Sequence, residues 1–362
     1  MASERSDYLD GLRGFAILGV VLIHVGQLYS SAVPSVLANF TNYGFRGVQL
    51  FFMVSALTLT ASLRRRPTDL RRYALRRLLR IAPMFYLAAV FYLILGGTGP
   101  SRFAPDGISP LDISLTFLML HGFSLTSINS VVPGGWSVAS EVIFYALLPL
   151  TLMFATNLHR SLFLLVIGVV AAILFPPVIH AVFSQVPHRE LVDDFAEFGF
   201  FANAPAFLLG IVGYWVLESR ASLRLPDYAG PALMILSIVG LVAVGCEDIA
   251  WLRSNLVADF LLFGLVIGGA VSATSLLTTR VLRALGTVSF SLYLWHFVVI
   301  GLVWALTRQL EIPPMLQLAL NYGATIAIAF LLSTVSYRFI EKPGMQVAAS
   351  LSQRKAALAA SA

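Results

Sequence analysis

The chain has 362 residues, of which 58% are hydrophobic and only 12% are charged. A soluble domain carries about twice that charged share, so the composition excludes a water-soluble enzyme and indicates an integral membrane protein. The net charge of +6 does not indicate a nucleic-acid binder, because apolar stretches separate the basic residues. A single cysteine, Cys246, excludes an intramolecular disulfide and a cysteine-based metal cluster, and we expect no metal site.

Apolar stretches of about twenty residues with few or no charges predict ten transmembrane helices in an all-α, polytopic fold. With the N-terminus in the cytoplasm, cytoplasmic segments hold 19 Lys and Arg residues and outside segments hold 5. The positive-inside rule therefore predicts that both termini are cytoplasmic. The predicted spans cover 11–30, 46–63, 81–98, 135–155, 161–182, 198–217, 230–246, 255–277, 286–307 and 316–337.

The connections divide the chain no further. We expect one transmembrane domain over 1–343 and a short, disordered cytoplasmic tail over 344–362. The connection 99–134 faces outward on this topology, where it would either recognise an acceptor or serve as a plain structural loop. Its apolar piece 111–127 is interpreted as interfacial or re-entrant, because an eleventh span would put most later arginines outside.

The first predicted helix carries two polar side chains on one face. Arg13 and His24 are eleven residues apart, which is three helical turns plus about 20° and roughly 16 Å along the axis. An unperturbed histidine titrates near neutrality and suits a general base that acts on a hydroxyl. The alternative is a neutral core histidine that is hydrogen-bonded to a neighbouring helix.

Eight arginines and one acid lie in the cytoplasmic segment 64–80. Arg77 and Arg80 share a helical face at the start of the third span, and the planar guanidinium suits phosphate oxygens. We therefore expect these two residues to bind a phosphate-bearing ligand. For the outer members Arg64 to Arg66 we favour attraction to anionic lipid headgroups, which is also the alternative for the other two.

Two later spans carry further candidates. Ser137, Glu141 and Tyr145 follow Trp136 at helical steps of four in the fourth span, where Glu141 lies at a depth similar to that of His24. A Glu141–His24 contact would raise the basicity of the histidine, and the alternative is a structural ion pair or hydrogen bond between helices.

In the ninth span Tyr293 and His296 lie one turn apart, which suits either substrate binding or interhelical packing.

Taken together and in this order, these phrases resemble the integral-membrane acyltransferase family 3. The family's arginine–ten residues–histidine pattern falls on Arg13 and His24, and the resemblance runs to Glu341-Lys342-Pro343. The second span departs from the pattern, with Gln49 and Ala56 where relatives commonly carry Asp and Gly. The other matching phrases are Arg77 to Arg80, Trp136-Ser137 to Glu141 and Tyr145, and Ser291 to His296.

The resemblance implies transfer of an acyl group, most often acetyl, from cytoplasmic acyl-coenzyme A to a hydroxyl of a carbohydrate or glycolipid acceptor. Arg13, Arg77 and Arg80 would hold the coenzyme's phosphates. His24 would be the general base, with Glu141 beside it, and covalent acyl-histidine is a less favoured variant. Trp136, Ser137, Tyr145, Tyr293 and His296 would bind substrate. Acyl-coenzyme A would be a co-substrate, with no cofactor bound permanently.

The esterase-like domain of some relatives is absent from this sequence, so we expect a stand-alone transferase in the bacterial inner membrane. A rival hypothesis is a transporter or flippase, since buried His and Glu often relay protons. Transporters usually show matching inverted halves, which we do not find here, and the arginine segment has no obvious role in one. A purely structural scaffold would leave the shared face of Arg13 and His24 unexplained.

Overall fold

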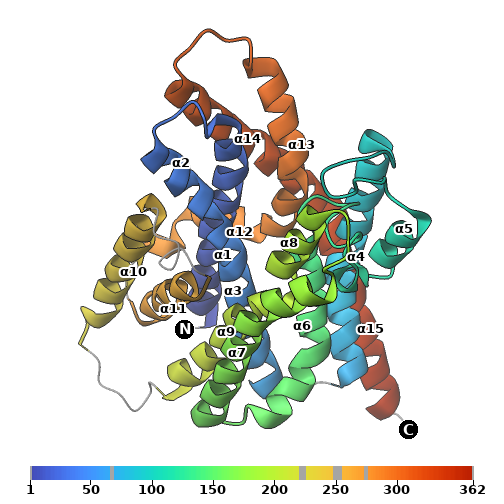
Figure 1. The fold of residues 1–362 in the computed structure, drawn as a ribbon. Coiled ribbons are helices and arrows are strands. Elements are labelled where there is room, and N and C mark those ends of the chain that lie inside the picture. The colour runs from blue at the N-terminus through green and yellow to red at the C-terminus, as the bar shows by residue number, and fades with distance from the viewer. Residues whose placement is uncertain (1, 66–68, 220–225, 248–254, 273–275, 361–362) are drawn as a thin grey trace. The chain divides into compact units, whose positions relative to one another are not determined.

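The computed structural model describes residues 2–65, 69–219, 226–247, 255–272 and 276–360. Over these ranges the regular structure is helical apart from one isolated bridge between Ser101 and Ala104, and the all-α prediction is confirmed (Figure 1). The α-helices are α1 (Ala2–Gly26), α2 (Ser35–Asn42), α3 (Arg46–Arg65), α4 (Leu70–Gly96), α5 (Pro110–Phe117), α6 (Gly135–Phe154), α7 (Leu158–Val182), α8 (Arg189–Phe198), α9 (Phe200–Ser219), α10 (Ala229–Cys246), α11 (Asn255–Val271), α12 (Arg280–Thr287), α13 (Ser289–Thr307), α14 (Pro314–Ser336) and α15 (Lys342–Ala360).

Nine helical stretches of the described residues are long and apolar enough to cross a membrane, which confirms the polytopic prediction. Each predicted span coincides for most of its length with a different long helix, and the span predicted over 255–277 corresponds to the shorter apolar helix α11. α1 begins at Ala2, well before the predicted start at residue 11. Hydropathy marks only the part of a helix that suits lipid, and the polar residues of its first turns extend the same helix beyond that part. The orientation of the termini stays a prediction.

The chain divides into two compact units. The first unit comprises Met1–Ala61, Ala155–Val170 and Asn203–Leu331, and the second comprises Ser62–Phe154, Ala171–Ala202 and Leu332–Ala362. Each unit is described by itself below.

In the first unit α1 packs against α12 at backbone contact distance. A Cβ atom on Gly14 of α1 or Gly286 of α12 would lie 2.0 or 1.8 Å from a backbone carbonyl oxygen of the other helix, and one on Gly11 would lie 1.5 Å from the carbonyl oxygen of Leu277, which precedes α12. Only glycine allows this approach. Within a membrane the hydrophobic effect does not drive helices together, so close packing through small residues contributes the stabilising contacts instead. These contacts fix the position of α1, the helix that carries Arg13 and His24.

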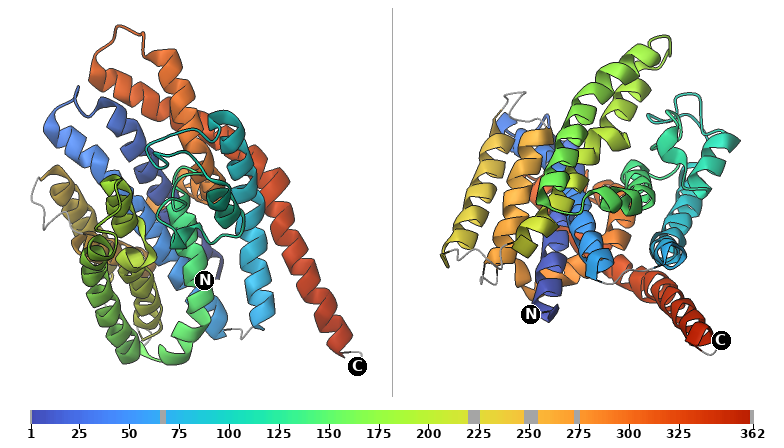
Figure 2. Two further views of the ribbon diagram at one scale, coloured as in Figure 1. Left: turned by 45° about the vertical axis from the view of Figure 1, so that its right-hand side comes forward. Right: turned by 90° about the horizontal axis from the view of Figure 1, so that it is seen from below.

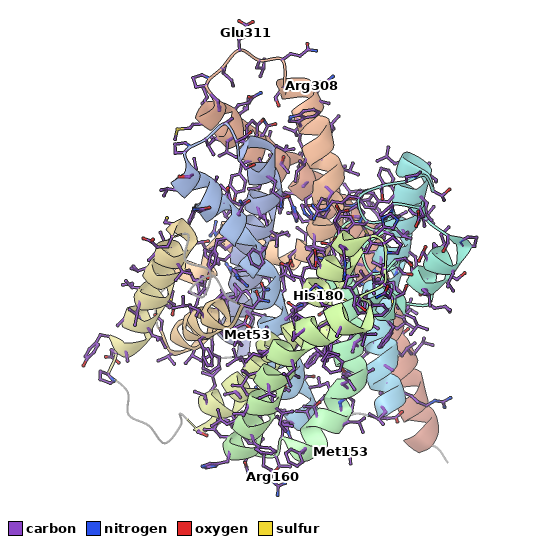
Figure 3. The ribbon with its side chains drawn as sticks, viewed as in Figure 1. Met53, Met153, Arg160, His180, Arg308 and Glu311 are labelled. Atoms are coloured by element: carbon purple, nitrogen blue, oxygen red, sulfur yellow. The ribbon has the colours of Figure 1, made fainter. Side chains whose placement is uncertain are left out.

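The same unit has a buried apolar core. Leu12, Leu50 and Met53 are fully buried within it, and Met53 is labelled on α3 in Figure 3. α10 and α11 lie side by side (Figure 1), and Arg308 and Glu311 mark the connection from α13 to α14 (Figure 3).

In the second unit α4 and α15 lie side by side (Figure 2). The segment 344–362, expected to be a disordered tail, is helical as far as Ala360, and its many alanines favour that conformation. Arg64, assigned to lipid from the sequence, donates a hydrogen bond to the Leu152 carbonyl oxygen at 2.5 Å, and Arg66 lies outside the described residues.

The apolar piece 111–127 does not form a membrane-crossing helix. It contains α5, whose eight residues extend only about 12 Å. Ser109 and Asp112 form a capping box at its start, in which each side chain accepts from the backbone N–H of the other residue.

Candidate functional site

His24 lies in the last turn of α1 and is partly exposed. Its Nδ1 is 3.4 Å from Oε1 of Gln27, which is a long contact to an exposed side chain. On the other side its ring contacts two rings of α13, with centroid distances of 5.2 Å to His296 and 4.4 Å to Phe297. The predicted base therefore stands between an exposed amide and a buried histidine.

His296 has no exposed surface. Its Nδ1 is 2.5 Å from the carbonyl oxygen of Tyr293, one turn earlier in α13, and its ring lies 5.5 Å from the Tyr293 ring. Its Nε2 is buried without a hydrogen-bond partner among the described residues. The structure thus brings together three predicted site residues, His24, Tyr293 and His296.

Arg13 lies on the same continuous helix as His24, as predicted. Its Nη1 donates to Oδ1 of Asp10 at 2.8 Å, in a partly exposed ion pair within one helical turn. The pair holds the guanidinium near the end of α1 distant from His24. The helical rise keeps the two residues roughly 16 Å apart along the axis.

The predicted donor arginines belong to the second unit, on α4. The Arg77 guanidinium lies 5.8 Å from the centroid of the Tyr145 ring, and its Nε is buried with no hydrogen-bond partner in the described part of the chain. Tyr145 in turn donates to Oε1 of Glu141 at 2.5 Å. Arg77, Tyr145 and Glu141 therefore form one connected polar group across α4 and α6.

The other members of these motifs have separate neighbours. Arg80 donates from Nη1 to Sδ of Met345 on α15 at 3.5 Å. Trp136 stacks on Phe198, with ring centroids 4.7 Å apart and planes tilted by 11°. Ser137 donates to the Gly134 carbonyl oxygen at 3.0 Å, so both residues fix the start of α6.

Glu141 and His24 belong to different units, and their contact stays a prediction.

The connection 99–134 is organised around Asp112, which is buried. Its carboxylate accepts hydrogen bonds from the hydroxyls of Ser109, Thr126 and Ser127 at 2.6 Å each. Burial raises the pKa of Asp112, but these hydrogen bonds outweigh burial and leave the pKa below its usual value. The geometry favours the structural alternative for this loop.

His121 ties the same connection to its neighbours. Its ring stacks on Phe85 with centroids 5.3 Å apart, and its Nε2 is 3.1 Å from the Gly135 carbonyl oxygen. Burial lowers the pKa of His121 to about 4, and the bond to Gly135 offsets only part of that effect. The ring is therefore neutral at neutral pH, which suits a packing residue.

A cavity of about 350 Å³ also lies in the first unit, lined by α1 residues from Phe15 to Leu22 and by apolar side chains of α10 and α11. Phe15 precedes His24 by nine residues, which is about half a turn beyond two full turns, so the cavity borders the opposite face of α1. Arg46, the one charged side chain among the described residues that line it, donates to Oδ1 of Asn255. This cavity therefore does not contain the predicted base.

Three contacts of the site residues were not predicted from the sequence. Two are the contacts of the His24 ring with the rings of His296 and Phe297, and the third is the hydrogen bond from Tyr73 Oη to the Tyr145 carbonyl oxygen at 3.0 Å. Each contact joins helices that are far apart in the sequence, so no local pattern could have indicated it.

Comparison with known families gives a direct match. The family model described as an acyltransferase domain matches residues 6–335. The chain belongs to this acyltransferase family. The family resemblance inferred from the motifs is confirmed, and the match includes every predicted site residue.

Curated relatives agree with this assignment. The chain is 26% identical to the O-acetyltransferase OatA of Staphylococcus aureus strain MRSA252 over 97% of its own length, and 27% identical to the putative peptidoglycan O-acetyltransferase YrhL of Bacillus subtilis strain 168 over 92%. It spans 60% and 54% of these two relatives. No solved structure matches the chain.

Proposed function

We propose that the protein transfers an acetyl group from acetyl-coenzyme A to a hydroxyl group of a carbohydrate-type acceptor, with His24 as general base. The observation that carries the proposal is the continuous helix α1, in which Arg13 and His24 lie three turns apart on one face. The acyltransferase match over 6–335 and the O-acetyltransferase names of the relatives support the reaction type.

The chemistry follows from what a neutral imidazole can do. One nitrogen of His24 takes the proton of the acceptor hydroxyl while the oxygen attacks the thioester carbonyl carbon. A C–O bond forms, the C–S bond breaks, and the departing thiolate receives the proton from the imidazolium. The products are the acetyl ester and coenzyme A, and His24 returns to its neutral form.

The donor would be held by the arginines. Arg77 and Arg80 would bind phosphate oxygens of the coenzyme, and Arg13 would assist from α1. Arg77 supports this role because its buried Nε has no protein partner among the described residues, which a ligand oxygen would satisfy. The thin pantetheine arm of the donor suits the roughly 16 Å between Arg13 and His24.

The acceptor would be a glycan of the cell envelope. The name of YrhL specifies peptidoglycan, and on the predicted topology a surface glycan would approach from outside while the donor comes from the cytoplasm. Trp136, Ser137, Tyr145 and Tyr293 would contribute to substrate binding, and Glu141 would act together with Tyr145, to which it is hydrogen-bonded. The protein would work in the plasma membrane, which in a bacterium with two membranes is the inner one.

The test is transfer of radiolabelled acetyl from acetyl-coenzyme A to a soluble glycan fragment by protein reconstituted in liposomes. His24→Ala should lower turnover about a hundredfold or more, because a methyl group cannot accept a proton. His159→Ala, an exposed histidine at the start of α7, is the matched control and should leave turnover unchanged. Turnover within about tenfold of the parent for folded His24→Ala would remove His24 from the mechanism.

A further inference from the structure

A pair of histidines from sequence-distant helices stands at the predicted base. His24 comes from α1 and His296 from α13, and their ring centroids are 5.2 Å apart. Phe297 packs against both rings, with centroid distances of 4.4 and 4.1 Å, and so holds the two imidazoles in register. Of the pair, only His296 is wholly buried.

The hydrogen bonding of His296 determines which of its nitrogens carries the proton. A backbone carbonyl oxygen can only accept, so Nδ1, which lies 2.5 Å from the Tyr293 oxygen, must be the N–H donor. In the neutral ring Nε2 then keeps a lone pair and can only accept. That atom is buried and has no hydrogen-bond partner within the described ranges, which is costly for a polar atom in a native structure.

The His24 ring can supply the missing donor. Two imidazoles with centroids 5.2 Å apart have room for one direct N–H···N bond, whose nitrogens would be about 3 Å apart. In the structure the two rings are in contact but do not form that bond. Catalytic hydrogen bonds are often long or poorly aligned before substrate binds. The competing partner, Gln27, is exposed and lies 3.4 Å away, so it constrains His24 only weakly.

We propose that His296 is the positioning residue of the reaction: its Nε2 accepts the N–H of His24, which fixes the tautomer of His24 and aims the other nitrogen at the acceptor hydroxyl. When His24 takes the proton from that hydroxyl, both of its nitrogens become donors, and the lone pair of His296 stabilises the cation within an apolar surrounding. This inference rests on the proposed function, in which His24 is the base.

The test compares three variants in the same liposome assay. His296→Phe keeps a flat ring of similar size but has no acceptor nitrogen, and should lower kcat at least about tenfold, as loss of an orienting partner does. The KM for acetyl-coenzyme A should change less than about twofold, because His296 orients the base and does not bind the donor.

His296→Gln is the conservative rescue. Its amide N–H can donate to the Tyr293 oxygen while its Oε1 accepts from His24, so kcat should recover to within about threefold of the parent. Gln27→Ala is the matched control on the other side of His24 and should also stay within about threefold. All variants are first checked for parental thermal stability and elution volume, which a purely structural role of His296 would change.

The outcomes separate the two hypotheses. If His24→Ala is inactive while folded His296→Phe keeps parental kcat, the positioning role is wrong and the base assignment stands. If both variants turn over normally, the base assignment itself is wrong. If Gln27→Ala loses activity and His296→Phe does not, the orienting partner is Gln27, which also overturns the inference.

Discussion

Gly286→Ala tests whether α1 is held against α12 by backbone contact. The added methyl carbon would lie 1.8 Å from the carbonyl oxygen of Asp10, whereas ordinary contact requires 3.4 to 4 Å. The two backbones would have to separate by at least about 1.6 Å, the difference between 3.4 Å and 1.8 Å. Because the obstacle is a backbone oxygen, no rotation of a side chain can relieve the clash.

The cost follows from overpacking in a close-packed interface. Backbone shifts of this kind typically cost about 1–3 kcal/mol, whereas glycine to alanine in an unobstructed helix gains about 0.5–1 kcal/mol from chain entropy. Gly301 in α13 and Gly323 in α14 are the matched controls, since a Cβ at either position meets nothing within 4 Å. We expect Gly286→Ala to be less stable than either control by about 1.5–4 kcal/mol.

The assay is thermal unfolding of the three purified variants in one detergent, followed by tryptophan fluorescence. Gly286→Ala should unfold at a clearly lower temperature than the parent, and Gly301→Ala and Gly323→Ala at the same or a slightly higher one. The displacement would also move Asp10 and with it Arg13, its partner at 2.8 Å, so donor binding should weaken. Equal unfolding temperatures for Gly286→Ala and Gly301→Ala would refute the close contact.

Three further predictions test the donor site, the orientation and the loop. Arg77→Ala and Arg80→Ala should each weaken acetyl-coenzyme A binding, measured as KM, by about 1.5–3 kcal/mol. The KM for a pantetheine thioester without phosphates should hardly change. Equal losses for both donors would show that the arginines stabilise the fold and do not bind the donor. In a cysteine-free background, an impermeant thiol reagent added to whole cells should label Glu311→Cys but not exposed Asp69→Cys; labelling of the latter would reverse the topology. Burial lowers the pKa of His121 from 6.5 to about 4, so between these pH values the unfolded chain binds more protons than the folded one. The free energy of unfolding should therefore fall as the pH falls from 6.5 to about 4. His121→Phe should reduce the difference between the unfolding temperatures measured at about pH 7 and about pH 4.5.

The sequence predicts the long helices well because lipid offers the backbone no hydrogen-bond partners. A stretch that crosses the hydrocarbon region must satisfy all its own hydrogen bonds, so length and hydropathy alone indicate a helix. That reasoning found a helix for each predicted span, including the 17-residue α11. It says nothing of short helices outside the spans, and α2, α8 and α12 were not predicted.

The connection 99–134 shows what a closer look at local chemistry could have added. Ser109 is followed by Pro110 and, three residues on, by Asp112, a pattern that resembles a capping box at the start of a helix. The pattern would have predicted α5 and a structural role for Asp112. The hydrogen bonds from Thr126 and Ser127 to Asp112 could not have been predicted, since they depend on how the chain folds back over the next fourteen and fifteen residues.

The partners of the candidate site residues could not be predicted from the sequence, because they come from other helices. Helical periodicity gives the depth of a residue and the face it shares with others, which is how Arg13 and His24, or Tyr293 and His296, were grouped. It does not tell which helix a face meets, so similar depth indicated Glu141 as a partner for His24 and gave no indication of His296.

The contact of His24 with His296 and the hydrogen bond from Tyr73 to the Tyr145 carbonyl oxygen depend on how helices far apart in the sequence pack. A motif within one helix thus identifies the reactive groups, and only the packing between helices identifies the partner that tunes each one. The His296 variants test that second kind of information, and a result against His296 would leave the motif-based assignment of His24 intact.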